Sequence, residues 1–133
     1  MDFRFIQEEL NNGVVNKDEV IEQILNLPCL YIILKGQSEA FCLDVYSQYD
    51  NKEIKIPLVY SNLEIAMEAI KEFDIPSCWN LMQWIEIREG LKYCLDLKNI
   101  EGMAIDSLPM GDKLNGLIID KESLVELSNM TYL

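Results

Sequence analysis

The sequence predicts a single α+β domain over residues 1–133, with a mixed sheet of roughly five or six strands and three or four helices packed against it. Half of the 133 residues are apolar, which supports one hydrophobic core and argues against disorder. The best-defined unit is the stretch 53–73, where an alternating strand stops abruptly and a helix follows. Neither a linker nor a low-complexity tract divides the chain.

The strand at 53–60 alternates, so four apolar side chains share one face: Ile54, Ile56, Leu58 and Tyr60. Ser61 follows as the predicted N-cap, with Glu64 at the capping-box position. The period of the next residues predicts a helix whose buried face carries Leu63, Ala66, Met67, Ile70 and Phe73. This unit describes the fold rather than the function.

Upstream, Asn16 is the predicted N-cap of a helix at 17–27 that ends before Pro28. The apolar runs 30–35 and 40–46 predict two strands, which form a meander with the strand at 53–60. Pro57 cannot donate a ladder hydrogen bond, so it indicates either an edge strand or a bulge in that strand. Residues 1–12 are compatible with a strand or a short helix.

Downstream, Ser77 is expected to cap a helix that reaches Glu89 and stops at Gly90, followed by a strand at 92–97. Two short strands at 102–106 and 116–120 each follow a glycine, and the loop 107–115 between them is longer than a hairpin needs. Asp120 is the predicted N-cap of a terminal helix at 121–128.

The charge balance restricts the function. Eleven basic and 23 acidic residues give a net charge of −12, which disfavours nucleic acids and anionic membranes and favours a basic protein partner. Histidine is absent, so the commonest general base and zinc ligand is missing. Dinucleotide, Walker and EF-hand spacings are absent too. We therefore predict no catalytic, cofactor-binding or metal-binding residues, and a protein that is not an enzyme.

The four cysteines show no CxxC spacing, and two of them lie in apolar runs, so buried free thiols in a reducing compartment are expected. The N-terminus lacks a long apolar run, which argues against a signal peptide or membrane span. Together these features predict a cytoplasmic protein.

The residues predicted to contact a partner are Trp79, Glu64, Glu68, Glu72, Glu86, Glu89, Asp106, Met110 and Asp112. The glutamates repeat on helical spacing, and Met110 and Asp112 lie in the long loop. Trp79 and Trp84 are compatible with core packing or with an interface. Asp106 and Asp120 form a catalytic pair only if their strands are parallel, whereas turn and N-cap roles suit an antiparallel pair.

The order of these elements resembles the SseB N-terminal domain family. Pro57-Leu58-Val59-Tyr60-Ser61 is similar to the family's proline–hydrophobic–aromatic–Thr/Ser strand end, and Gly116–Asp120 before the last helix is similar to its late glycine turn. The resemblance spans about 30–127. The chain departs from the family at the aromatic position, because the family usually has Phe where Val59 or Tyr60 stands here. It implies an α+β fold without established chemistry.

Three functional hypotheses follow. The first is a non-catalytic protein-binding module, for instance an acidic immunity-type inhibitor that neutralises a basic toxin. The second is an SseB-like accessory or housekeeping domain with an unknown partner or small ligand. The third, an enzyme that uses carboxylates, needs a buried carboxylate pair in a cleft.

Overall fold

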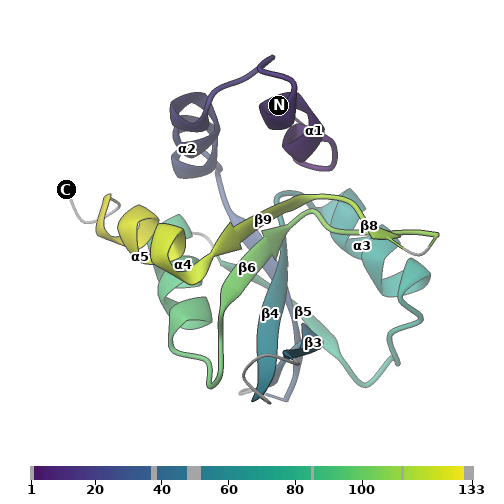
Figure 1. The fold of residues 1–133 in the computed structure, drawn as a ribbon. Coiled ribbons are helices and arrows are strands. Elements are labelled where there is room, and N and C mark those ends of the chain that lie inside the picture. The colour runs from purple at the N-terminus through teal and green to yellow at the C-terminus, as the bar shows by residue number, and fades with distance from the viewer. Residues whose placement is uncertain (1, 37–38, 48–51, 85, 112, 131–133) are drawn as a thin grey trace.

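The computed structural model describes residues 2–36, 39–47, 52–84, 86–111 and 113–130 (Figure 1). The helices are α1 (Ile6–Asn11), α2 (Lys17–Leu25), α3 (Leu63–Glu72), α4 (Ile87–Leu95) and α5 (Lys121–Met130). The strands are β1 (Leu30–Lys35), β2 (Glu39–Ala40), β3 (Cys42–Ser47), β4 (Lys52–Tyr60), β5 (Asn80–Trp84), β6 (Gly102–Ile105), β7 (Pro109–Met110), β8 (Lys113–Leu114) and β9 (Leu117–Asp120).

Seven of these strands form one mixed sheet, which confirms the predicted α+β class. The path runs β2-β1-β4-β6-β9, with β3 added to β4 and β5 added to β1. The β4–β6 pair is parallel, whereas β6–β9 and the pairs made by β1 are antiparallel. β7 and β8 form a separate small hairpin, which explains the length of the loop between β6 and β9.

Pro57 lies opposite a bulge in the facing segment, whereas the sequence had predicted an edge strand or a bulge in Pro57's own strand. β4 pairs with Ile100 at Lys55 and with Ala104 at Leu58, so the facing segment holds one more residue than β4 between these points. The ladder is therefore interrupted where proline has no N–H to donate. β4 itself is a central strand with neighbours on both sides.

The sheet lies between two layers of helices (Figure 1). Alternate residues point to opposite faces: Ile32, Val59 and Ile105 join the core under α1, α2, α4 and α5, whereas Ile33 and Leu58 join the core under α3. This period of two is what a sheet buried on both sides requires. Both faces are apolar, so each needs helices to cover it.

The predicted helix at 77–89 and strand at 92–97 are wrong. Residues 80–84 form β5, which pairs with β1 from Leu30↔Trp84 to Leu34↔Asn80. The helix in this region is α4, which begins at Ile87 and includes most of the predicted strand. The second edge of β1 offers unpaired backbone groups, and pairing satisfies them. Gly90 does not end a helix but lies inside α4. A Cβ there would come within 3.2 Å of Leu30 Cδ1, so glycine lets the helix pack closely against Leu30 of β1.

The predicted N-cap of α3 is also wrong by one residue. Asn62 caps the helix, because its Oδ1 accepts a 2.9 Å hydrogen bond from the Ile65 N–H. The buried face consists of Ile65, Ala66 and Ala69, so the helix is rotated relative to the expected stripe. Small alanines let α3 lie close to the sheet.

The cysteines are free thiols, with Cys29 and Cys94 buried, Cys42 half-buried and Cys78 exposed. Burial raises the pKa of Cys42 to about 11 and that of Cys94 to about 12, so neither is a nucleophile at neutral pH. Within the described ranges, none of the helices has the length and apolar character needed to cross a membrane.

Candidate functional site

The outer surface of α3 exposes two large apolar side chains beside a row of carboxylates. Leu63 and Met67 are 50% and 54% exposed, although the sequence had predicted them to be buried. Glu64, Glu68 and Glu72 are exposed on the same helix. We call these five residues the α3 surface. Leu63 and Met67 are one turn apart, so they form a continuous apolar strip next to the acidic row.

The other predicted acidic pair does not extend this surface. Glu86 and Glu89 are exposed at the start of α4, and α4 covers the opposite face of the sheet (Figure 1). The two acidic groups therefore cannot contact one flat partner together. A variant at Glu86 and Glu89 is consequently a natural control for the α3 surface.

Met110 lies on the α3 side of the molecule. It is 55% exposed in β7, and Leu108 just before it is buried in the same core cluster as Ile65 and Ala66. Asp112, the neighbouring predicted contact residue, lies outside the residues that the structure describes.

The tryptophans pack inward, which answers the question that the sequence left open. Trp79 is half-buried and contacts Phe41 edge-on, with the ring centroids 5.9 Å apart. Trp84 packs on Tyr93, with centroids 5.3 Å apart. Trp79 therefore stabilises the core beneath α3 and is not a protruding interface anchor.

Asp106 is 1% exposed, so its prediction as a partner-contact residue is wrong. Its Oδ1 accepts a 2.7 Å hydrogen bond from the Ser61 N–H, and its Oδ2 accepts a 2.6 Å bond from Ser61 Oγ–H. Tyr60 Oη–H donates to the Ser107 carbonyl at 3.0 Å. These bonds tie together the ends of the parallel strands β4 and β6, so the cluster has a structural role.

The charge state of Asp106 depends on opposing effects. Burial is the larger and raises its pKa, whereas the two Ser61 hydrogen bonds lower it. Asp2 raises the pKa and Arg4 lowers it, both to a smaller extent. A catalytic pair with Asp120 is excluded, because β6 and β9 are antiparallel and place the two aspartates at opposite ends.

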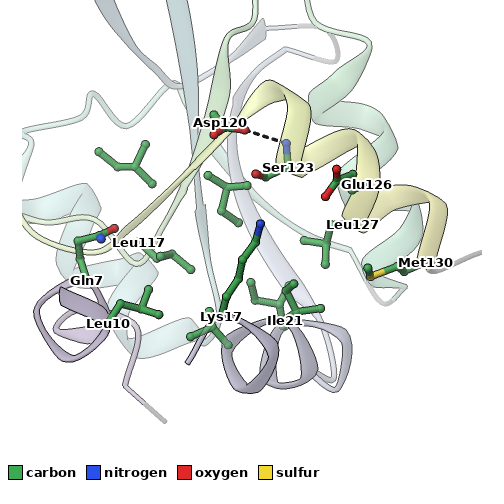
Figure 2. Close-up of a pocket in the computed structure, with 14 residues that line it drawn as sticks. Gln7, Leu10, Lys17, Ile21, Leu117, Asp120, Ser123, Glu126, Leu127 and Met130 are labelled. Atoms are coloured by element: carbon green, nitrogen blue, oxygen red, sulfur yellow. Dashed lines mark hydrogen bonds between the residues drawn. The ribbon is translucent and has the colours of Figure 1, made fainter. Parts of the chain in front are cut away.

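Asp120 acts as the predicted N-cap of α5. Its Oδ1 accepts a 2.7 Å hydrogen bond from the Ser123 N–H, and this bond lowers the pKa of Asp120. The fixed side chain stands at the upper rim of a groove (Figure 2).

This groove lies between α1 and α2 on one side and β9 and α5 on the other, with a volume of about 290 Å³. Most of its lining is aliphatic, including Val20, Ile21, Ile24, Leu117, Ile119 and Leu127. Figure 2 shows Lys17 projecting from α2 across the groove toward Asp120, Ser123 and Glu126. After the Ser123 hydrogen bonds, the Lys17 ammonium makes a smaller contribution to the lowered pKa of Asp120.

Sequence reasoning did not find the groove. The apolar period of the helix at 17–27 places Val20, Ile21 and Ile24 on one face, and these side chains line the groove. The space depends on how far α2 stands from α5, and those helices are about a hundred residues apart in sequence. Lys17 directly after an N-cap is the one local signal, and it is also typical of an exposed helix start.

No protein-family model, no curated protein and no solved structure matches this chain. The resemblance to the SseB N-terminal domain therefore stays a prediction based on its short motifs.

Proposed function

We propose that this protein is a non-catalytic binding module that uses the α3 surface to hold a basic protein partner. The observation that carries the proposal is the exposure of Leu63 and Met67 beside Glu64, Glu68 and Glu72. Exposed apolar residues bordered by charges are typical of interaction sites. Because α3 is firmly packed through Ile65, Ala66 and Ala69, the surface is presented on a rigid element.

Each part of the surface has a distinct contribution. The carboxylates attract a positively charged partner and accelerate its association, in line with the net charge of −12. Leu63 and Met67 supply apolar area that becomes buried and slows dissociation. Methionine adapts its shape to different contacts, and Met110 adds a second one on this side of the molecule.

The more specific form of the proposal is an acidic immunity-type inhibitor that covers the basic active site of a toxin. A compact acidic chain suits that role because nucleic-acid-cleaving enzymes present basic clefts to phosphate. The free thiols are compatible with a cytoplasmic location, where such a toxin would need to be neutralised. The alternative, an SseB-like accessory domain, also leaves the α3 surface available for a protein.

The test is affinity capture from the native host with tagged protein, followed by binding kinetics with the purified partner. Two double variants are compared with the wild type: E64Q/E68Q on α3 and E86Q/E89Q on α4. Both raise the net charge equally, so they separate a local surface from a general acidic field. A third variant, L63A/M67A, removes the apolar strip.

We expect E64Q/E68Q to slow association and to weaken its salt dependence, and L63A/M67A to speed dissociation. E86Q/E89Q should bind the partner with the same rates as the wild type, apart from a small change in the association rate. Equal losses of association rate in the two charge variants would show that only the net charge of the protein affects binding. Binding that none of the three variants changes would exclude the α3 surface as the binding site.

A further inference from the structure

The groove between α2 and α5 lies on the opposite face of the sheet from α3 (Figure 1). We propose that it binds a small linear aliphatic cation, such as a medium-chain alkylammonium. The proposal does not rest on the proposed function, because none of the α3 surface residues lines the groove.

The size and lining of the groove define the body of this ligand. At a share of roughly 30 Å³ for each non-hydrogen atom, a volume of about 290 Å³ accommodates about ten such atoms. Leu117 and Ile119 are buried lining residues of β9, and Ile21 and Leu127 line opposite sides. An aliphatic chain gains the transfer of its methylenes out of water there, whereas a polar chain would lose hydrogen bonds.

The charges of the groove define the end group. Lys17 is the single cation among the lining residues, and Asp120 and Glu126 are both anions. Lys17 interacts with Asp120, whose carboxylate is also held by Ser123. The two carboxylates outnumber the one ammonium, so the lining carries a net negative charge that a positive end group complements. The overall charge of −12 acts in the same direction against an anionic ligand.

Three probes of equal chain length, which fit the volume of the groove, separate the two contributions: octylammonium, octanol and octanoate. Their affinities are measured by titration calorimetry near neutral pH and low salt, below the concentrations at which the probes self-associate. Methyl NMR of the Ile, Leu and Met side chains locates the binding. We expect the largest shifts at Ile21, Ile119 and Leu127, and small ones at Leu63 and Met67.

The cation should bind about twofold to fivefold more tightly than the alcohol, which is the range for an ion pair in a solvated site. Octanoate should bind more weakly than either. E126Q should remove the preference for the cation and leave alcohol binding unchanged. K17Q should strengthen cation binding, because the lining then holds two carboxylates and no cation. The matched control E122Q changes a carboxylate of α5 outside the groove and should have no such effect.

Ile21 is half-buried, so I21F narrows the groove with a larger apolar side chain and should weaken the binding of all three probes. Tightest binding of octanoate would overturn the proposal, because Lys17 would then define an anion site. Equal affinities of the cation in wild type and E126Q would overturn the role of Glu126. Absence of methyl shifts around the groove with any probe would overturn the site itself.

Discussion

The hydrogen bond between Ser61 and Asp106 provides the most direct test of how the two halves of the sheet are joined. The perturbation is Ser61→Ala, which removes the 2.6 Å bond to Oδ2 and keeps the 2.7 Å bond from the backbone N–H to Oδ1. A hydrogen bond to a charged group contributes about 1.5–3 kcal/mol to stability. Ser61 is half-buried, so water replaces part of the lost bond, and we expect a loss of about 1.5–2 kcal/mol.

The effect should depend on pH in a defined direction. Burial raises the pKa of Asp106 above its ordinary value of 3.8, so the folded protein keeps a proton that the unfolded chain has released. The contribution of Asp106 to stability therefore falls as pH rises through the window above 3.8. Removing the Ser61 hydroxyl raises the pKa further and widens this window. The stability difference between wild type and S61A should consequently grow with pH and then level off.

The assay is urea unfolding followed by tryptophan fluorescence from about pH 4 to about pH 8. Ser107→Ala is the matched control, because the Ser107 Oγ is buried without a hydrogen-bond partner in the structure. The Ser107→Ala substitution should lower the free energy of unfolding only slightly at any pH. The double variant S61A/D106N should be less destabilised than the sum of the single variants. A loss in S61A that is the same at every pH, or no larger than that in S107A, would refute the charge-assisted bond.

Two further predictions concern turns and caps. Gly116→Ala should cost at least about 2 kcal/mol, because φ is +96° and the new Cβ would stand 2.6 Å from the Ile105 carbonyl oxygen. Gly111→Ala is its control in the same assay: φ is +62° with nothing within 4 Å, so only the backbone cost of about 1–2 kcal/mol is expected. Asn62→Ala should destabilise α3 by about 1 kcal/mol through loss of the cap, without the pH dependence predicted for S61A. A neutral Asn62→Ala variant in urea unfolding would contradict the assigned cap.

The candidate site was only partly predictable. The sequence singled out Glu64, Glu68 and Glu72, because charge at helical spacing is a local property. It could not show that Leu63 and Met67 are exposed, since the rotation of α3 depends on which residues fit the sheet. The close fit of Ala66 and Ala69 decides that rotation. Glu86 and Glu89 were predicted correctly as exposed, but only the topology places them on the other face.

The sequence by itself determined the α+β class, the helix capped by Asn16, and the strands whose residues alternate in polarity. Those features follow from local caps and from periods of 2.0 and 3.6 residues, which are encoded within short stretches. Tertiary structure alone decided that residues 80–84 are a strand, because their partner is the open edge of β1. It also decided that Asp106 is buried against Ser61 and that α2 and α5 leave a groove. Those outcomes depend on residues distant in sequence meeting in space, where unpaired backbone groups and close packing overrule local preference.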